Sequence, residues 1–488
     1  MADSLDNTIS KSALKYEWLV LTVTTVGTLM GGIDSRIVVI GLPTVAHQLH
    51  ADPEQLVWIT QAYVLATTVC LLMVGRIGDV YGRVKIYNWG FAIFTVGSGL
   101  CALSANPTQL IAFRIVQGIG AAMIFTNSGA IITDAAPVKS LGTMLGVNQM
   151  ALRVGSIAGL TLSGLILTFV NWRGLFYVNV PIGIFGTIWA YKRLHAISTR
   201  EVSSKIDMPG FLSFTVSLSM ILLGITFLGY GLQDTTTSYS LLIIGFILLG
   251  IFARIESTAE SPMLDLKVLK IRVFALANLA QLLNSITWTG LALILAFYLQ
   301  IGLGYTPLQA GIGIVPVDII YLISTLFSSR LSDRHGSKIL ATSGLAVNIL
   351  GFLLLATFSL STNYYYIAVV LVIFGLGNGL FNTPNTREIM SSVPPERRGV
   401  ASGVRSMMFN LGLTLSYGVV ILLLTKGIPY TEFSQLLQGT ISSDSIPLAR
   451  TEFLTGFRIT SLVFAALMVF AIIPSWIRGE PTPIHQSL

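Results

Sequence analysis

The sequence predicts an all-α membrane protein with fourteen transmembrane helices, arranged as two related six-helix bundles with two helices inserted between them. Three observations lead to this fold class: the composition, the length of the apolar stretches and an internal repeat. Of the 488 residues, 53% are hydrophobic and 10% are charged, whereas roughly 25% are charged in a typical soluble domain. So few charged residues cannot cover an ordinary water-exposed surface, and we therefore expect the chain to be embedded in a lipid bilayer.

Fourteen apolar stretches are long enough to cross a bilayer, which takes about 20 helical residues. In chain order, the predicted spans are 18 to 42, 57 to 74, 86 to 103, 110 to 132, 141 to 170, 175 to 191, 208 to 230, 239 to 255, 273 to 301, 307 to 327, 339 to 358, 364 to 386, 400 to 424 and 453 to 476. The residues before the first span are polar and acidic, and that span is longer than the core of a signal peptide. No cleaved leader is therefore expected.

The lysines and arginines are distributed unevenly between the two sides of the membrane. If the amino terminus is cytoplasmic, 21 of the 29 lie on the cytoplasmic side, and three lie outside, namely Arg173, Lys426 and Arg450. Such an excess is typical of cytoplasmic loops, so we expect a multi-pass protein of the cell membrane with both termini in the cytoplasm. The basic loops then face anionic lipid, and the net charge of +7 requires no nucleic-acid partner.

The residues that usually carry enzyme or metal chemistry are sparse. Cys70 and Cys101 both fall in predicted spans, which supports neither a disulfide nor a zinc site, and we expect them to be packing residues. The chain has no HExxH motif, no paired-aspartate metal motif and no Ser/His/Asp arrangement. A membrane-embedded enzyme is therefore disfavoured, and no cofactor or metal is expected.

The sequence contains an internal repeat. "PVKSLGTMLGVNQMALRVG", from Pro137, aligns with "PPERRGVASGVRSMMFNLG", from Pro394, at an offset of 257. At an offset of 254, "GRIGDVYG" aligns with "SRLSDRHG" and superposes Asp79 on Asp333. We therefore predict a first six-helix bundle, a segment of linkers and two inserted helices, and a second six-helix bundle with the tail, at residues 1–195, 196–271 and 272–488. Two parallel halves are typical of transporters whose substrate site lies between them near the membrane midplane.

Several motifs resemble the major facilitator superfamily, and within it the fourteen-span drug:proton antiporter family, along essentially the whole chain. "GRIGDVYGRVK" (75 to 85) matches the superfamily motif between spans two and three, and "RIVQGIGAA" (114 to 122) matches the motif of span four. Three stretches resemble the fourteen-span family, namely "DSRIVVIGLP" (34 to 43), "NWRGLFYVNVPIG" (171 to 183) and "YLQIGLGYTPLQAGIGIVP" (298 to 316). The resemblance implies the major facilitator fold and secondary transport by alternating access.

Two positions depart from the family pattern. The span-one motif of the family usually has threonine and asparagine where this chain has Arg36 and Val39. The span-five antiporter motif usually has Gly-Pro where this chain has Gly159 and Leu160. These departures leave open whether transport is antiport or symport, and whether the substrate is drug-like.

The loop from 75 to 85 is predicted to be a latch between conformations. Gly75 and Gly82 permit a tight turn, and Asp79 can pair with Arg83 or with the positive end of a neighbouring helix. The second copy keeps an acid at Asp333. The alternative is a solvated loop whose positive charge only fixes the topology.

Charged residues deep inside a span cost several kcal/mol unless they are paired or hydrated. Asp34 is predicted roughly 12 Å below the outer end of span one and Arg114 roughly 10 Å below the outer start of span four, so their levels match. A carboxylate beside an arginine near the midplane can titrate and release its partner, and the family resemblance gives this pair the role of proton coupling. Asp318 is the second candidate for a proton carrier, or a site for a cationic substrate. Arg36 cannot share the helix face of Asp34, and whether it faces a cavity, another acid or the outer interface stays open.

Polar residues follow the helical period on two apolar spans, which predicts that they face a cavity or another helix rather than lipid. Hydrogen bonding between helices and contact with substrate are equally good interpretations. A further stripe residue on span twelve is Asn385, and Phe125 and Tyr321 are possible cavity aromatics. The predicted substrate cavity comprises Arg36, Tyr63, Asn278, Gln281, Asn284, Trp288, Asn378 and Asn382.

The expected function is secondary active transport of the multidrug type, in which hydrophobic or cationic organic compounds leave the cell in exchange for protons. The alternative is a proton-coupled carrier of organic anions or other small metabolites. A non-transporting receptor would have little use for two repeated halves with a latch. The expected partners are a small-molecule substrate, protons and the lipid bilayer, and we expect the chain to act as a monomer.

Overall fold

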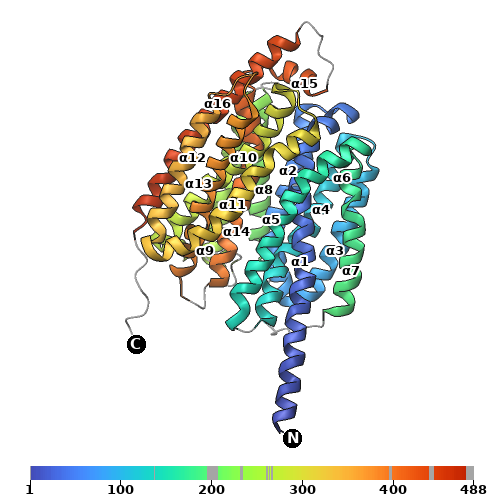
Figure 1. Cartoon of the computed structure of the whole chain (residues 1–488), viewed down its shortest axis with the longest axis vertical. Helices are drawn as coiled ribbons and strands as arrows, with labels where there is room; N and C mark the ends of the chain where they lie inside the picture. The colour runs from blue at the N-terminus through green and yellow to red at the C-terminus, as the bar shows by residue number, and fades with distance from the viewer. Residues whose placement is uncertain are drawn as a thin grey trace. The chain divides into compact units, whose positions relative to one another are not determined.

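The structure is a computed structural model that describes residues 2–136, 138–194, 207–230, 235–259, 262, 264, 268–394, 398–438 and 445–479. Within these ranges, helices dominate and no β-strand occurs (Figure 1). The predicted all-α class is therefore confirmed.

The helices follow one another with short connections. In chain order they are α1 (Ala2–Leu49), α2 (Pro53–Tyr81), α3 (Arg83–Leu103), α4 (Pro107–Ala135), α5 (Val138–Phe169), α6 (Gly174–Tyr177), α7 (Asn179–Arg193), α8 (Met208–Tyr230), α9 (Thr235–Thr258), the 3₁₀ turn η1 (Val268–Lys270), α10 (Arg272–Phe297), the π turn η2 (Tyr298–Gly302), α11 (Pro307–His335), α12 (Ser337–Leu355), α13 (Tyr364–Ser391), α14 (Arg398–Leu424), α15 (Tyr430–Gln438) and α16 (Ile446–Ile477). Each predicted span falls on one or two of these helices, and some helices extend well beyond it, as α1 does at both ends of the predicted span 18 to 42.

Thirteen of the helical segments in the described part of the chain are long and apolar enough to cross a membrane. The predicted span from 57 to 74 is not among them, but it lies within the 29-residue helix α2. The predicted sixth span is divided between α6 and α7, with Val178 between them. The predicted outer loop from 427 to 452 contains a short helix, α15, that the hydropathy pattern does not predict.

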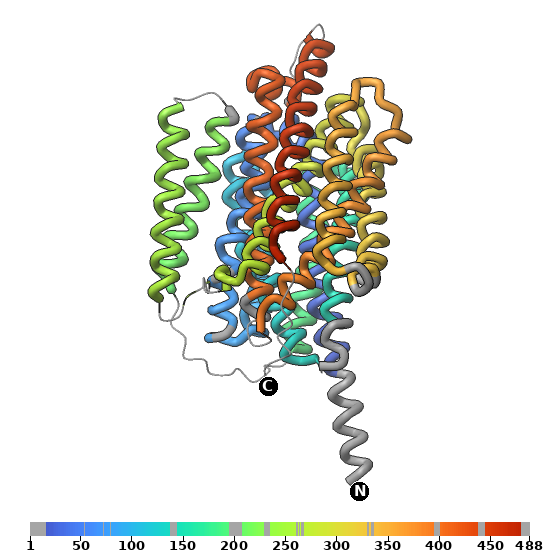
Figure 2. The backbone as a smooth tube through the Cα atoms, turned by 90° about the vertical axis from the view of Figure 1, so that its left-hand side faces the viewer, coloured from blue at the N-terminus to red at the C-terminus, as the bar shows by residue number. Residues whose placement is uncertain are grey.

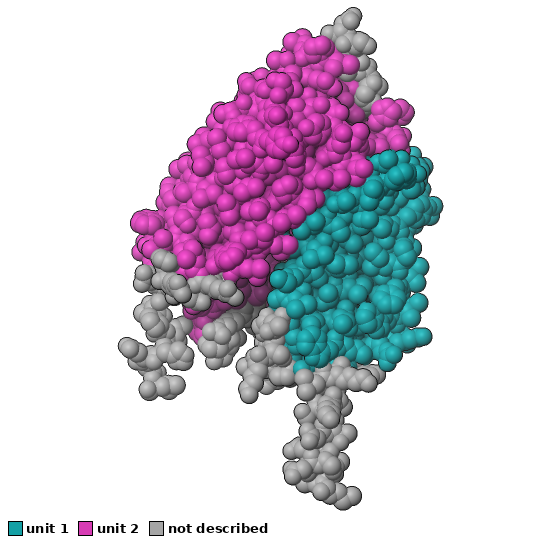
Figure 3. All heavy atoms as spheres, viewed as in Figure 1, with its two compact units in different colours: residues 1–41, 65–206 teal, residues 42–64, 207–488 magenta. Residues whose placement is uncertain are grey.

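The chain forms two compact units (Figure 3). Unit 1 contains residues 1–41 and 65–206, and unit 2 contains residues 42–64 and 207–488. In unit 1, α3 packs on α4 and α7; in unit 2, α10 packs on α14 and α16, and α13 packs on α11 and α12. The inserted helices α8 and α9 run side by side, and α8 packs on α14 (Figure 2). The three-part division by sequence repeat stays a prediction.

Small residues let helix backbones approach closely inside each unit. A Cβ atom at Gly155 of α5 would overlap the carbonyl oxygen of Leu29 on α1. A Cβ atom at Gly412 of α14 would lie 2.7 Å from the carbonyl oxygen of Leu282 on α10. Gly155 and Gly412 are matched by the sequence repeat, so the two halves use the same position for the same kind of close helix contact.

Candidate functional site

A buried ion pair lies in unit 1. Arg114 Nη1 on α4 is 2.9 Å from Asp34 Oδ2 on α1, and the two side chains are 1% and 0% exposed. The second carboxylate oxygen accepts hydrogen bonds from Gln117 Nε2 and from Asn179 Nδ2, each at 2.9 Å. The predicted match in depth between Asp34 and Arg114 therefore corresponds to a direct contact, and two amides complete the surroundings of the carboxylate.

Residues around the pair hold Gln117 and Arg114 in place. Gln117 Nε2 also donates to Ser98 Oγ at 2.7 Å, and Arg114 Nη1 donates to Gln117 Oε1. The Arg114 guanidinium lies over the Phe176 ring, 5.7 Å from its centroid. The ion pair therefore lies in a frame of side chains from α3, α4 and α6.

The sequence prediction missed three residues of this cluster: Ser98, Gln117 and Asn179. Gln117 follows Arg114 by three residues and so lies on the same helix face. This spacing could have identified Gln117 from the sequence. Asn179 begins α7, directly after Val178, whose backbone angles remain helical. Hydropathy does not give the rotation of a helix about its own axis, so the contact of Asn179 with Asp34 was not predictable from it.

Arg36 lies two residues after Asp34 on α1 and is partly buried. No described residue forms a hydrogen bond or ion pair with its side chain. It does not belong to the cluster around Asp34, as the helical period predicts.

Arg83 at the start of α3 forms an ion pair with Asp134 at the end of α4, in which one nitrogen donates to both carboxylate oxygens. The Nη1–Oδ1 and Nη1–Oδ2 distances are 2.8 and 2.9 Å, and about a third of each side chain is exposed, 35% and 34%. Gly82, which precedes α3, has a φ of 98°, a conformation that only glycine adopts at little cost. The side chains of Asp79 and Asp333 lie outside the described part of the chain, so their predicted role in the latch stays a prediction.

The predicted amide stripe on α10 is buried in unit 2, where part of it binds other helices. Asn284 Nδ2 donates to Asn378 Oδ1 on α13 at 3.1 Å, and Asn348 Nδ2 on α12 donates to Asn284 Oδ1 at 3.4 Å. Asn278 Nδ2 donates to the carbonyl oxygen of Phe274 in its own helix at 2.9 Å. Interhelical bonding, one of the two open interpretations, therefore applies to Asn284 and Asn378.

Other predicted cavity residues of unit 2 are placed as follows. The rings of Trp288 and Tyr321 are 5.8 Å apart between centroids, so α10 and α11 carry a buried aromatic pair. Asn382 on α13 is partly buried. Asp318 on α11 is 2% exposed, and neither of its carboxylate oxygens has a hydrogen-bond partner in the described part of the chain.

The first turns of α2 belong to unit 2 and include Tyr63, which is 5% exposed. Gln61 Nε2 is 3.5 Å from the carbonyl oxygen of Thr414 on α14, and the backbone N–H of Glu54 donates to the Tyr430 hydroxyl at 3.4 Å. Burial raises the pKa of Tyr430 to about 12, so the hydroxyl stays neutral and can accept this bond at any physiological pH. The sequence prediction included Tyr63 but none of these contacts.

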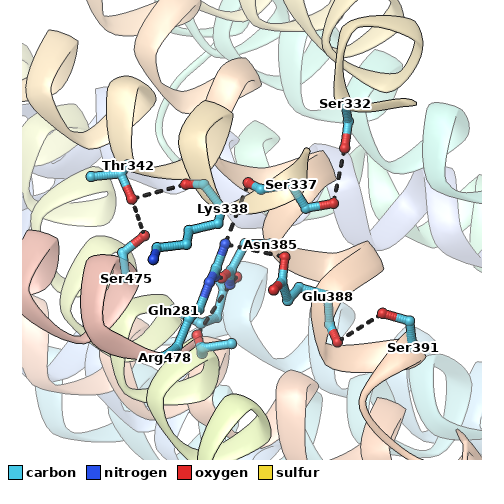
Figure 4. A network of polar contacts seen from close by, with 11 residues as sticks. Gln281, Ser332, Ser337, Lys338, Thr342, Asn385, Glu388, Ser391, Ser475 and Arg478 are labelled. Carbon is cyan, nitrogen blue, oxygen red and sulfur yellow. Dashed lines mark hydrogen bonds and ion pairs between the residues drawn. The ribbon is translucent and has the colours of Figure 1, made fainter. Parts of the chain in front are cut away.

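A second charged residue pair lies at one end of unit 2 (Figure 4). Arg478, which follows α16, has its Nη2 atom 3.4 Å from Glu388 Oε2 on α13, and both side chains are buried. Its Nη1 atom donates to Asn385 Oδ1 at 2.7 Å. Burial lowers the pKa of Arg478 and the Glu388 carboxylate raises it, but arginine starts so high that it keeps its charge. The sequence prediction missed Arg478 because this residue lies beyond the last predicted span, which ends at 476.

The chain is similar to a known protein family, to curated proteins and to solved structures. The model of the Major Facilitator Superfamily matches residues 24–417 and 277–487. A riboflavin transporter, RibZ, of Clostridioides difficile is 30% identical over 82% of this chain and 87% of its own length. The multidrug resistance protein Stp of Mycobacterium tuberculosis is 27% identical over 97% of this chain and 94% of its own length.

Solved transporters share the fold. A D-xylose–proton symporter has a TM-score of 0.66 at 12% identity and covers 97% of this chain and 100% of its own. A bacterial homologue of the lysosomal transporter Spinster has a TM-score of 0.65 at 16% identity and covers 95% of this chain and 97% of its own. At these identities, the likeness concerns the fold alone. The family model matches most of the chain, and the two curated relatives cover most of its length. The chain therefore belongs to the Major Facilitator Superfamily and is a multi-pass membrane transporter, not an enzyme.

Proposed function

We propose that the protein exports hydrophobic or cationic organic compounds in exchange for protons. The observation that carries this proposal is the ion pair of Asp34 and Arg114, which is buried at matching depth and surrounded by amides. Burying a charge pair is costly for stability, so its presence favours a function that uses it. Protonation of Asp34 removes the attraction to Arg114, and this change in charge can bias one conformation over another.

The names of curated relatives support the substrate class. Relatives called multidrug resistance or multidrug transporter proteins occur in Mycobacterium tuberculosis and Bacillus subtilis. Asp318 supports a cationic substrate, because a buried carboxylate without a described hydrogen-bond partner is stabilised by a bound cation or by a proton. We assign Asp34 and Arg114 to proton coupling and keep Asp318 as a second carrier or a cation site.

A second candidate function is the transport of an organic anion or a neutral metabolite. Two observations favour it: a relative named as a riboflavin transporter, and Arg36, whose side chain has no hydrogen-bonding or ionic partner in the described part of the chain. In both cases the proposed orientation places the amino and carboxyl ends in the cytoplasm, and the monomer is the functional unit. Arg83 and Asp134 then form a latch on the cytoplasmic side.

The deciding experiment measures transport by purified protein in liposomes. Ethidium represents hydrophobic cations and riboflavin represents the alternative class, and only a pH gradient is imposed. Accumulation of ethidium against its concentration gradient on the side that supplies protons supports the proposal. If riboflavin alone accumulates, the second function holds. If neither compound accumulates while either equilibrates faster than in empty liposomes, proton coupling is wrong.

A further inference from the structure

The short helix α15 packs on two longer helices of unit 2. Its apolar face contains Phe433 and Leu437, which lie one turn apart and are both buried. The centroid of the Phe433 ring is 5.9 Å from that of Phe297 at the end of α10 and 6.4 Å from that of Phe453 on α16. Figure 1 shows α15 beside the first turns of α16. Apolar contacts therefore hold α15 against α10 and α16.

The first residue of α15 contacts a third helix, α2. The backbone N–H of Glu54, in the first turn of α2, donates to the Tyr430 hydroxyl at 3.4 Å. The first turns of α2 belong to unit 2, and the helix continues into unit 1 after Val64. Tyr430 thus contacts a helix that both units share.

Two acidic side chains meet between α15 and α16. Glu432 and Glu452 directly precede the paired phenylalanines 433 and 453, and their carboxyl groups form a hydrogen bond. Glu452 Oε2 is buried, and no N–H or O–H group in the described part of the chain donates to it. An ionised carboxylate has acceptor atoms only. The hydrogen bond therefore requires a proton on one of the two carboxyl groups.

The proton between these groups determines how the contact depends on pH. Glu452 precedes the predicted span of 453 to 476. Burial raises the pKa of Glu452, and the hydrogen bond with Glu432 and the charge of Glu432 raise it further. Release of the shared proton to water leaves two negative charges side by side. The stabilising contribution of the pair is therefore present at low pH and is lost as the pH rises through the raised pKa.

Other charged groups lie at the same end of unit 2 as α15. Arg458 donates to the carbonyl oxygen of Phe358 at 3.0 and 3.3 Å. Burial and the neighbouring Asp52 raise the pKa of Glu54. In the described part of the chain, the acidic, basic and histidine groups at this end besides the pair are His47, His50, Asp52, Glu54, Lys426, Arg450 and Arg458. A test of pH dependence must therefore distinguish the pair from the acids and histidines that precede and begin α2.

We propose that Glu432 and Glu452 make the attachment of α15 sensitive to pH. One shared proton joins α15 to α16 at low pH, and ionisation of both groups separates α15 from α16 and Tyr430 from α2. In the proposed orientation, this end of unit 2 faces the outside of the cell. The attachment itself is independent of substrate and of coupling, whereas its effect on transport rests on the proposed function. Two measurements separate these parts.

The first measurement follows the distance between α15 and α16 without any substrate. Nitroxide labels are attached through Gln435→Cys and Thr451→Cys, which change exposed positions on the two helices, in the full-length protein with Cys70→Ala and Cys101→Ala. The protein is placed in lipid nanodiscs, and electron paramagnetic resonance gives the distribution of distances between the labels. This distribution should be narrow at about pH 5 and broader and longer at about pH 8.

Three variants identify the groups that titrate. Glu432→Gln donates an N–H to Glu452 without a shared proton, so its distribution should stay narrow at both pH values. Glu54→Gln is the matched control, because it removes the acidic side chain nearest in sequence to the α2 contact but keeps the backbone N–H that reaches Tyr430. His50→Asn is the second control, since asparagine tolerates the positive φ of 49° at this position. Both controls should keep the pH response of the parent protein.

Several outcomes would overturn the proposal. The distribution of the folded parent protein could be the same at both pH values, or Glu432→Gln could keep the parent response. Loss of the response in Glu54→Gln or in His50→Asn would assign the titration to a group near α2 instead. If Glu432→Gln fails to fold, Glu452→Gln makes the same hydrogen bond from the other side and decides the question in its place.

The second measurement is the initial rate of ethidium or riboflavin transport in liposomes at a constant pH difference, with the outer pH varied. Alternating access moves the first bundle, to which α2 belongs in the predicted division, relative to the second. Release of Tyr430 from α2 should therefore raise the parent rate by about threefold or more between about pH 5 and about pH 8. Glu432→Gln should stay slow at both values. A pH-dependent distance with pH-independent rates overturns the link to transport. A parent protein that transports neither compound counts against the proposed function, and the distance measurement still decides the attachment.

Discussion

Arg114 Nη1 lies 2.9 Å from Asp34 Oδ2, and neither side chain is more than 1% exposed. Transfer of each charge from water costs several kcal/mol before the attraction between them offsets it. Gln117 and Asn179 reduce this cost because they donate to the other oxygen of the carboxylate. Their bonds also fix the position of the carboxylate beside Arg114, which is compatible with the proposed role in proton coupling.

Asp34→Asn should abolish transport that is driven by a pH gradient while retaining substrate binding. The asparagine oxygen can still accept from Arg114, but the side chain cannot exchange a proton at physiological pH. The measurement is ethidium accumulation in proteoliposomes with only a pH gradient, beside equilibrium binding. Asp52→Asn, at an exposed acid between α1 and α2, serves as the control and should transport like the parent. Accumulation by the Asp34→Asn protein would falsify the assignment.

Arg114→Gln should fail in a different way from Asp34→Asn. It leaves a buried carboxylate without its cation, and such a loss destabilises a protein by about 3–5 kcal/mol. The double variant Asp34→Asn/Arg114→Gln should recover most of that stability and still lack coupled transport. Thermal unfolding in detergent, measured beside the transport assay, separates the two effects. Equal stability of the single and double variants would show that the pair is not coupled energetically.

The sequence predicted the depth of Asp34 and Arg114 in the membrane, but it did not predict all of the residues that contact charged side chains. Helix rise alone placed Asp34 and Arg114 at one level, because a straight helix converts residue number into height. Asn179 was missed because its contact with Asp34 depends on the rotation of α7, and Arg478 was missed because it lies just beyond the last apolar stretch. The rotation of each helix about its own axis depends on packing, so hydropathy alone did not distinguish lipid-facing from protein-facing amides.

Arg83→Gln should slow transport with little loss of stability. The pair with Asp134 is about one-third exposed, so its contribution to stability is about 0–1 kcal/mol. We propose that this ion pair forms in one conformation and breaks in another. Arg83→Gln should therefore lower the transport rate by about tenfold or more. Initial rates and thermal midpoints are compared with those of Lys85→Gln, which changes an exposed cation in the same first turn of α3. Parent-like transport by Arg83→Gln would leave the positive charge at this end of α3 with a topological role only.

Gly412→Ala should destabilise the protein, whereas Gly403→Ala should not. Both glycines lie on α14, but a Cβ atom at 412 would be 2.7 Å from the Leu282 carbonyl oxygen, and one at 403 meets nothing within 4 Å. Overpacking against a backbone costs about 1–3 kcal/mol, while alanine in an open helical position gains up to about 1 kcal/mol over glycine. Thermal midpoints of the two variants should move in opposite directions. Equal shifts would mean that α10 and α14 do not make this close contact.

Arg36→Thr tests the choice between cationic and anionic substrates. A cavity-facing arginine attracts anions and repels cations, so its removal should weaken riboflavin phosphate binding by about tenfold or more and leave ethidium binding equal or tighter. Arg173→Thr removes an arginine that already stacks on Trp172 and serves as the control. Equal affinities of the parent and the Arg36→Thr protein for both compounds would place Arg36 away from the transport pathway.

Asp318→Asn tests whether the buried acid of α11 binds the substrate cation or carries a proton. Neither oxygen of Asp318 has a hydrogen-bond partner in the described part of the chain, and an ionised carboxylate in such a place is stabilised by a cation. If it binds ethidium, the variant should raise the Kd for ethidium by about tenfold or more and leave that for riboflavin unchanged.

Transport by the same variant separates a cation site from a proton carrier. A cation site predicts weaker ethidium binding in Asp318→Asn, because the attracting charge is gone. A proton carrier predicts unchanged binding and no accumulation of ethidium under a pH gradient. If Asp318→Asn binds ethidium like the parent at every pH but no longer couples transport to the pH gradient, Asp318 is a proton carrier and not a cation site.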